Sequence, residues 1–446
     1  MVKSPFSVKF SVEESAFSRI VEGLDPAFIE EALTATGTAT IRTRRLPADQ
    51  VLWLVLGMAL YRLRPIVELV ARLGLVLPGK RGPTAAPSAI AQARARLGPK
   101  PLQWLFERCS RHWALESARR HPWRGFTLFA GDGSTVRVPD SQENREHFGS
   151  QKAGGKRGIS GYPLVRLFTL TTARSHLLFA LGFGPYADER VYAKPLWEEL
   201  PDYSVTLLDR LFLAANILIP LHRNGTERHW LTRAKKNTLW TVLKKLGPGD
   251  ELVEMNVSDS ARKQDPSLPK TWVVRAIRYQ RRGFLPQTVL TSLLDPEKYP
   301  AKELIALYHE RWEIELGYDE IKTELLEREE TLRSKSPAMV EQEIWGMALA
   351  YNLVRLEMER VAEELGVSPN RISFTMALRL IQDEWAWCSD AAPGAIPKNL
   401  SRLREDLKRF VLPKRRSQRS FPRAVKLKMS NYVRKRPTTL KQRSAK

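Results

Sequence analysis

The chain has 446 residues, of which 43% are hydrophobic, and a formal net charge of +23. This length allows two or three domains with sizeable cores, and the composition excludes a disordered polymer. The longest uncharged apolar runs, 51–61 and 211–221, cover 11 residues each and are too short for a membrane span, which needs roughly 18 residues. Only Cys109 and Cys388 are present, so a disulfide framework is excluded and we expect a cytoplasmic protein without an export signal.

The positive charge is concentrated near the C-terminus. Residues 401–446 contain 17 Lys and Arg and two acidic residues, so 15 of the 23 excess positive charges lie there. Basic clusters alternate with apolar residues such as Phe410, Phe421 and Tyr432, which suggests partial folding against a surface. We expect this tail to attract nucleic-acid phosphates through counterion release. A solubilising tail or contact with an anionic membrane explains the same charge.

Residues 1–120 are predicted to form an all-α, DNA-binding N-terminal domain. Helices are expected over the following ranges, separated by Pro and Gly residues: 14–34, 47–73, 87–97 and 99–119. The segments 65–73 and 88–96 resemble the two helices of a helix-turn-helix unit, and residues spaced by four would give one face that meets DNA. On this second helix Arg94 and Arg96 are candidate DNA contacts. A plain helical bundle explains the pattern equally well.

Strand patterns replace helical ones from residue 124, and residues 121–366 are predicted to form an α/β domain. Its elements are expected in the order β-β-β-α-β-α-β-α, the first three strands being antiparallel. In chain order they cover 126–136, 163–173, 176–183, 186–199, 204–208, 211–222, 229–234 and then, after an interruption, the strand 288–293 and a helix through 308–322. The interruption, about 235–285, has strand-like pieces at 250–257 and 271–279 and is predicted to be a β-rich insertion. Helices at 337–365 and 368–387 follow, and residues 367–446 form the C-terminal helical region and basic tail.

Four polar residues fall on one stripe of the helix that follows the insertion. At about 100° per residue, Tyr308, Arg311, Glu315 and Lys322 project near 0°, 300°, 340° and 320°. An apolar stripe lies directly beside them, so the polar stripe borders the core. Asp319 also maps close to the polar stripe, at about 20°. Helical geometry alone therefore leaves Glu315 and Asp319 as two acidic candidates.

Two further carboxylates are placed at strand ends. Asp132 interrupts an apolar strand, and Asp209 directly follows the apolar run 205–208. An acid at such a position rarely lacks a partner, because an isolated buried charge is expensive. Together with an acid on the helix, they suggest shared divalent metal ions, since Mg²⁺ prefers carboxylate oxygens. For either Asp alone, a turn or helix-cap role is the more ordinary explanation, and only the joint placement of the acids favours a metal site.

These residues carry a resemblance to the DDE transposases of the insertion-sequence-four family. The family signature Y-x₂-R-x₃-E-x₆-K is present without a gap as Tyr308, Arg311, Glu315 and Lys322, which selects Glu315 over Asp319. Asp132 in Asp-Gly-Ser matches the first acid and Asp209 in Asp-Arg-Leu-Phe matches the second. The resemblance covers nearly the whole chain, including the helical N-terminal region and the insertion. It implies a catalytic domain of ribonuclease-H-like type.

The resemblance also implies a reaction and a set of partners. The enzyme would cut double-stranded DNA at the inverted-repeat ends of an insertion sequence and transfer the ends into target DNA. Asp132, Asp209 and Glu315 would bind two Mg²⁺ or Mn²⁺ ions. A homodimer would hold both ends, in the cytoplasm near the bacterial nucleoid. Arg311 and Lys322 would grip backbone phosphates, and Tyr308 would hydrogen-bond the terminal phosphate.

A hairpin intermediate is expected from the same resemblance, with one departure. Some hairpin-forming relatives place a Trp in the strand before the catalytic helix, where this chain has Gln287. Trp272 on the preceding strand is the candidate replacement for stacking on a flipped base, although a core position is an ordinary alternative.

The Gly-rich segment 149–157 superficially resembles a nucleotide-binding P-loop. Its glycine spacing is wrong, and Arg157 stands where Ser or Thr would meet Mg²⁺. We therefore predict a basic loop in which Lys156 and Arg157 contact DNA. Two alternatives to transposition remain at this stage: a structure-specific nuclease of the same fold, and a non-catalytic DNA-binding protein derived from a transposase.

Overall fold

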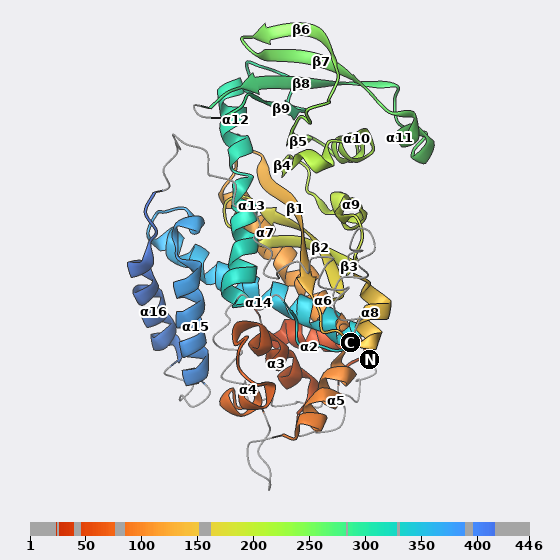
Figure 1. Ribbon diagram of the computed structural model, residues 1–446. Helices are drawn as coiled ribbons and strands as arrows, with labels where there is room; N and C mark the ends of the chain where they lie inside the picture. The colour runs from red at the N-terminus through yellow and green to blue at the C-terminus, as the bar shows by residue number, and fades with distance from the viewer. Residues whose placement is uncertain are drawn as a thin grey trace, which may run out of the picture.

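The computed structural model describes Leu24 and the ranges 26–39, 46–75, 85–150, 162–281, 284–327, 331–388 and 396–414. Figure 1 shows a helical body at one end, a long sheet running away from it, and the helix pair α12–α13 lying beside the sheet. Most of the basic tail, and the loop with Lys156 and Arg157, lie outside the described residues.

Nine strands form one mixed sheet within the described ranges, in the order β3-β2-β1-β4-β5-β9-β8-β7-β6. The strands are β1 (Thr127–Arg137), β2 (Leu164–Thr172), β3 (Leu178–Pro185), β4 (Ser204–Leu208), β5 (Arg228–Arg233), β6 (Thr241–Gly247), β7 (Asp250–Asn256), β8 (Thr271–Tyr279) and β9 (Gln287–Thr291). The first three strands are antiparallel, as predicted, while β1, β4 and β5 run parallel.

The predicted insertion continues this sheet and is not a separate layer. Strand β9 pairs antiparallel with β5, and β8, β7 and β6 follow in turn. Strand β6 was not predicted, because this edge strand is exposed along most of its length and lacks apolar alternation. The buried pair Arg275–Asp250, with Nε to Oδ1 at 2.8 Å, joins β8 to β7. Arg275 also donates to the carbonyl of Tyr299 at 2.6 Å, so the insertion is tied to the start of α12.

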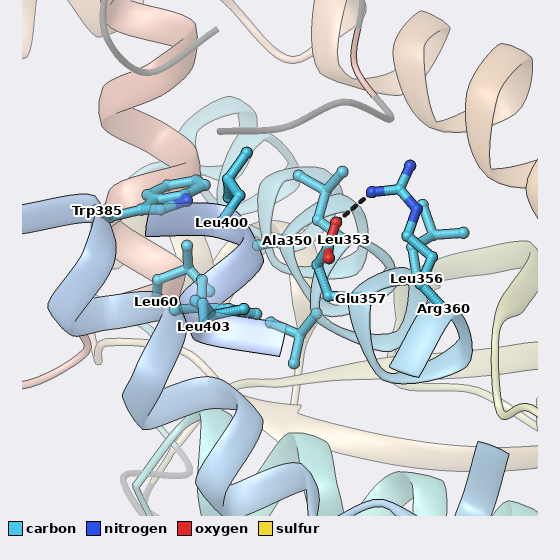
Figure 2. Close-up of a pocket in the computed structure, with 11 residues that line it drawn as sticks. Leu60, Ala350, Leu353, Leu356, Glu357, Arg360, Trp385, Leu400 and Leu403 are labelled. Atoms are coloured by element: carbon cyan, nitrogen blue, oxygen red, sulfur yellow. Dashed lines mark hydrogen bonds and ion pairs between the residues drawn. The ribbon is translucent and has the colours of Figure 1, made fainter. Parts of the chain in front are cut away.

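The N-terminal and C-terminal helices share one hydrophobic core. The N-terminal helices are α2 (Pro26–Ala35), α3 (Ala48–Leu60), α4 (Ile66–Arg72), α5 (Pro87–Leu97), α6 (Lys100–Leu105) and α7 (Arg111–Arg120). The C-terminal helices are α14 (Pro337–Glu364), α15 (Phe374–Cys388) and α16 (Ile396–Leu407). Helix α14 is buried along most of its length in this core. Figure 2 shows a small pocket at the junction of α3, α14, α15 and α16, lined largely by aliphatic side chains.

Helices cover the sheet on both faces, above two separate cores. On one face Phe129, Phe168 and Leu208 pack with α7 and α10 (Ala215–Arg223). On the other face Leu128, Ala130 and Leu207 pack with α12 (Ala301–His309) and α13 (Trp312–Asp319). Three short helices complete the layers: α8 (Gln142–Phe148), α9 (Glu189–Ala193) and α11 (Asp259–Gln264). The predicted helices 186–199 and 211–222 are present, each with a short 3₁₀ segment.

The helix expected through 308–322 is interrupted. Helix α12 ends at His309, α13 begins at Trp312, and a π-helical segment follows over Glu320–Leu325. The predicted apolar stripe is nevertheless buried, at Leu307, Ile314, Ile321 and Leu325. Because a π turn holds more than 3.6 residues, Lys322 does not keep the ideal angle assumed from the sequence.

The buried pair between β7 and β8 generates a stability prediction. Asp250→Ala would leave the Arg275 guanidinium, 0% exposed, without its carboxylate. We expect a loss of about 3–5 kcal/mol in the free energy of unfolding, measured by denaturant titration. Asp259→Ala, which removes the exposed partner of Arg262, is the matched control and should change stability by less than about 1 kcal/mol. Equal losses in both variants would contradict this account.

Candidate active site

Asp132 and Asp209 lie side by side on two parallel strands. Asp209 directly follows β4, as predicted, whereas Asp132 is not at a strand end, because β1 continues to Arg137 and pairs Asp132 with Thr169 of β2. In the β1–β4 pairing, Gly131 is opposite Leu208, so the next residue of each strand is an acid. Side chains alternate along a strand, and both acids continue the series that packs under α12 and α13. Adjacent strands are about 4.8 Å apart. The two carboxylates therefore lie on the face of the sheet that carries α12 and α13. These two helices contain most of the family signature and are called the signature helices below.

Each acid is also held by a backbone amide. The amide of Gly133 donates to Oδ1 of Asp132 at 2.8 Å, and the amide of Leu211 donates to Oδ1 of Asp209 at 2.5 Å. Asp209 thus caps the 3₁₀ turn Arg210–Phe212. The capping explanation considered for an isolated Asp is correct for this oxygen, and it fixes the carboxylate at the end of β4.

Glu315 reaches the same region from α13 and is paired with Arg311 at 2.7 Å. Burial raises the pKa of Asp132 to about 6, and the charges of Asp209 and Glu315 raise it further against the opposing effects of the Gly133 amide and Arg311. The charges of Asp209 and Glu315 therefore act on Asp132. Within the described ranges, however, no three acidic, His or Cys side chains are close enough together to hold a metal ion. Glu315 is turned towards Arg311.

Two tyrosine hydroxyls dock the signature helices onto strands β1 and β4. Tyr318 donates to the carbonyl oxygen of Asp132 at 2.9 Å, and Tyr308 donates to the carbonyl oxygen of Leu208 at 3.4 Å. Tyr308 is 7% exposed, and burial raises its pKa to about 12. Its predicted contact with a DNA phosphate has no direct support in this geometry and stays a prediction. The half-buried Lys322 lies on the π segment, whereas Asp319 is exposed to solvent.

A fourth carboxylate near the site was not predicted. Glu189 at the start of α9 lies over Gly133, so closely that a Cβ at that glycine would meet its Oε2 at 1.9 Å. Burial raises the pKa of Glu189 to about 6, and the charges of Asp132 and Asp209 add to this increase while Arg166 opposes it. No spacing rule links residue 189 to residue 132, because folding of α9 over β1 creates the contact.

An open cleft runs beside Asp209. It is lined by Asp209, Arg210, Leu211, Lys235, Lys236 and Asn237. Burial lowers the pKa of Lys235, as does the charge of Arg190, while Asp209 raises it. The lysines follow β5 directly and were not singled out in the sequence, although the doublet before Asn237 is a visible basic signal.

The predicted DNA contacts of the N-terminal domain divide into two groups. Arg94 was wrongly predicted, because it is 7% exposed and its guanidinium donates to Gln342 and Ser334 at 2.9 and 3.0 Å inside the helical core. Arg96 is exposed, together with Ser88 and Gln92. The face spaced by four is therefore open to solvent, as expected.

Trp272 makes a ring contact that favours the core alternative. Its ring centroid lies 5.5 Å from that of the buried Trp230. Gln287 accepts a hydrogen bond from the hydroxyl of Tyr279 at 3.1 Å. By contrast, Trp312, for which the sequence predicted no role, is 57% exposed. Cζ of Arg311 lies 5.8 Å from the centroid of the Trp312 ring.

Two family models match the chain. The model described as "Insertion element 4 transposase N-terminal" matches residues 14–107, and the model described as "Transposase DDE domain" matches residues 123–353. The chain is 39% identical over 412 residues to the Escherichia coli K12 transposase InsG of insertion sequence element IS4, covering 92% of each protein.

One solved structure is a distant match. It is a piggyBac transposase synaptic complex with hairpin DNA, which has a TM-score of 0.38 and 10% identity and covers 90% of this chain and 86% of the other. A likeness this weak supports no inference about the chain. Across the described helices, none is both long and apolar enough to cross a membrane.

The raised pKa of Asp132 predicts that replacing this carboxylate with a neutral side chain increases the stability of the protein at neutral pH. Its pKa rises from 3.8 to about 6 on folding, so the folded protein binds this proton more tightly than the unfolded chain. Stability is therefore lost as the pH rises from about 4 to 6. Without divalent metal, Asp132→Asn should increase the free energy of unfolding at pH 7 by on the order of 1–3 kcal/mol, which appears as a higher melting temperature. Near pH 4 the melting temperature should change little.

The matched control for this measurement is Asp319→Asn, at an exposed position of the same helical region. It should leave the melting temperature unchanged at both pH values. A lower melting temperature of Asp132→Asn at pH 7 would show that the carboxylate is stabilised in the metal-free fold, contrary to this expectation.

Proposed function

Because this chain belongs to the insertion element 4 family of DDE transposases, we propose that Asp132, Asp209 and Glu315 are its metal-binding catalytic acids. The chain is a DNA transposase. Membership of this family argues against the alternative of a non-catalytic DNA-binding protein. The observation that carries the assignment is the pairing of β1 with β4, which puts Asp132 and Asp209 side by side under α13. DDE enzymes act on phosphodiester bonds.

The donor set suits hard divalent cations. All three groups are carboxylates, and the pKa of Asp132, raised by burial and by its acidic neighbours, reports negative charge that a cation would offset. We propose two Mg²⁺ or Mn²⁺ ions, which when bound would activate the attacking oxygen and stabilise the leaving oxygen. Glu315 would exchange its contact with Arg311 for a metal contact. Arg311 would then be released to bind a DNA phosphate.

We also infer that the catalytic domain is of ribonuclease-H-like type. The strand order β3-β2-β1-β4-β5, with β1, β2 and β3 antiparallel and β1, β4 and β5 parallel, supports this assignment. The proposed domains are 1–120, 121–366 and 367–446, with the insertion at about 235–285. Helix α14 of the second unit shares one hydrophobic core with α3 of the first unit and with α15 and α16 of the last, so all three units pack together.

DNA would approach along the cleft beside Asp209. Lys235 and Lys236 line this cleft, Arg311 and Lys322 lie on the signature helices, and Arg96 lies on the exposed face of α5. These cations would contact backbone phosphates of the element ends and target DNA, with the basic tail adding attraction that depends on salt. Lys156 and Arg157 stay predicted contacts. A homodimer would hold the two ends, in the nucleoid region of a bacterial cell.

The hairpin step would depend on Trp312 in place of Trp272. A flipped base needs an open aromatic face, and Trp312 is 57% exposed beside a proposed phosphate-binding residue, whereas Trp272 packs on Trp230. Stacking of one base on an aromatic ring contributes about 1–3 kcal/mol.

The assignment of the acids is tested by single substitutions. With DNA carrying the inverted repeats that flank the coding region and with Mg²⁺, Asp209→Ala and Glu315→Gln should lower end cleavage at least about 10³-fold and leave end binding unchanged. Asp319→Ala is the control on the same helical region and should cleave normally. Undiminished cleavage by Asp209→Ala would refute the metal assignment.

A second experiment isolates the hairpin step. Trp312→Ala should leave first-strand cleavage intact and slow the subsequent hairpin formation by about tenfold or more, because loss of base stacking acts after the first cut. Trp312→Phe should restore most of the rate, and Trp272→Phe should behave as wild type. Equal slowing of both cleavage steps by Trp312→Ala would point instead to a general loss of DNA binding.

A further inference from the structure

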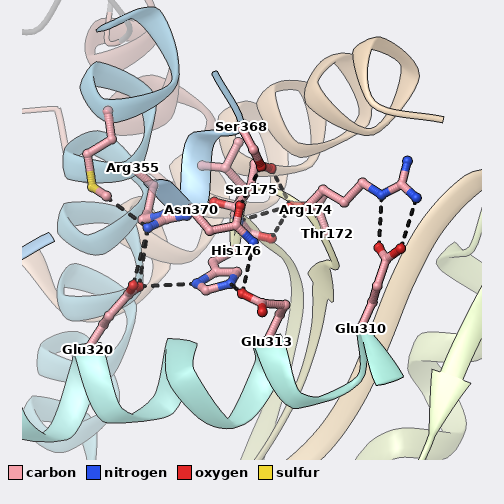
Figure 3. A network of polar contacts seen from close by, with 12 residues as sticks. Thr172, Arg174, Ser175, His176, Glu310, Glu313, Glu320, Arg355, Ser368 and Asn370 are labelled. Atoms are coloured by element: carbon pink, nitrogen blue, oxygen red, sulfur yellow. Dashed lines mark hydrogen bonds and ion pairs between the residues drawn. The ribbon is translucent and has the colours of Figure 1, made fainter. Parts of the chain in front are cut away.

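The turn between β2 and β3 contacts the back of the signature helices at three carboxylates. Arg174 forms a two-point ion pair with Glu310, with Nε to Oε2 at 2.8 Å and Nη2 to Oε1 at 3.0 Å. Nε2 of His176 lies 2.9 Å from Oε2 of Glu313, and Nδ1 lies 3.4 Å from Oε2 of Glu320. Figure 3 shows these carboxylates pointing from one side of the helix towards the turn.

The contacted side of the helix is opposite the proposed catalytic acid. Taking Glu313 as 0°, Gly317 and Glu320 project at about 40° and 340°, while Glu315 projects at about 200°. Gly317 confirms the close approach, because an added Cβ would lie 3.9 Å from Cβ of His176. Glu315 thus projects from the side of the helix away from the turn, which contacts the helix from behind.

The ring contacts of His176 are shielded from water. The ring is 2% exposed, and its partners Glu313 and Glu320 are 16% and 18% exposed. Polar contacts are stronger where water is excluded, so the ring can hold both carboxylates in place.

The turn and the two carboxylates are themselves held by other elements. His176 has a left-handed φ of +59°, and its amide donates to Thr172 at 3.0 Å. Arg355 of α14 donates to the carbonyl of Ser175 at 2.7 Å and pairs with Glu320 at 3.3 Å. Burial would raise the pKa of Glu320, but Arg355 and His176 lower it to about 2, so it is ionised.

Partners on other elements complete the network. The hydroxyl of Tyr351 donates to Glu320 at 2.7 Å, and the side-chain amide of Asn370 donates to Glu313 at 2.8 Å. The sheet, α14 and the segment 369–371 therefore all meet at the two carboxylates that flank Glu315 in sequence.

From this geometry we infer that His176 is a positioning residue for the transposase reaction, which, with Arg174, clamps α13 and the π segment so that Glu315 faces Asp132 and Asp209. The inference rests on the proposed role of Glu315. Loss of the clamp would let α13 shift relative to β1 and β4, and a displacement of about 1 Å at a catalytic group can cost about 10²-fold in rate.

The first test measures helix mobility without metal or DNA. In hydrogen exchange of the full-length protein, His176→Ala should speed exchange of the amides of 312–325 about tenfold or more, since the contacts of the ring with Glu313 and Glu320 are lost. His176→Gln, which can keep one donor, should give a smaller increase. Leu403→Ala, a core change in α16, is the control for general destabilisation and should leave these amides unchanged.

The second test measures the reaction. His176→Ala should lower the rate of end cleavage by about tenfold to 10²-fold with end binding unchanged, His176→Gln should recover part of the rate, and Leu403→Ala should keep the wild-type rate. Unchanged exchange of 312–325 in His176→Ala would overturn the clamp. Faster exchange with a normal cleavage rate, or an equal effect of Leu403→Ala, would overturn the positioning role.

These outcomes can be distinguished from a wrong assignment of Glu315 and from misfolding of His176→Ala. Exchange does not depend on catalysis, so a wrong assignment of Glu315 would appear in Glu315→Gln and not in the exchange measurement. Where His176→Ala does not fold, Glu313→Gln, which is nearly isosteric, should speed exchange of the same amides. No increase in Glu313→Gln would count against the clamp.

Discussion

The parallel pairing of β1 with β4 is the constraint on which the proposed active site depends. It sets Gly131 opposite Leu208, and the next residue on each strand is an aspartate. Strand alternation then turns both side chains to the face packed under α12 and α13. A register slip of one residue would turn one carboxylate to the opposite face, so the apolar cores on the two faces also hold the acids in place.

The same arrangement concentrates negative charge around Asp132. Without a bound cation, this charge does not stabilise the fold. Burial and neighbouring acids raise the pKa of both Asp132 and Glu189 to about 6. Arg311 partly compensates by pairing with Glu315. We expect a site of this kind to lower the stability of the metal-free protein and to favour binding of divalent cations, which is the usual exchange of stability for function at an active site.

The signature helices reach this site through contacts on two sides. Tyr308 and Tyr318 donate to backbone carbonyls of β4 and β1 at the front, while His176 and Arg174 bind carboxylates at the back. The break between α12 and α13 and the π segment after Asp319 mean that helical propensity alone does not set the orientation of Glu315. Tertiary contacts do so, which is why residues remote from the chemistry are expected to affect it.

The sequence by itself determined the chemistry and much of the secondary structure. Four residues at fixed helical spacing, with two strand-end aspartates, predicted a DDE transposase, and the family matches agree with that prediction. Strand boundaries such as 204–208 and the helix 87–97 were also predicted correctly, because apolar runs between Pro and Gly residues are local signals.

Only the tertiary structure decided how those parts meet. Arg94 and Arg96 differ by two positions, yet one is buried against α14 and the other is exposed. Packing against Gln342 of α14, 248 residues away in sequence, makes this distinction. Glu189 and His176 carry no local signal because their partners come from distant elements. Local sequence sets the conformation of short segments, whereas the pairing of charges across the fold depends on which segments become neighbours when the cores form.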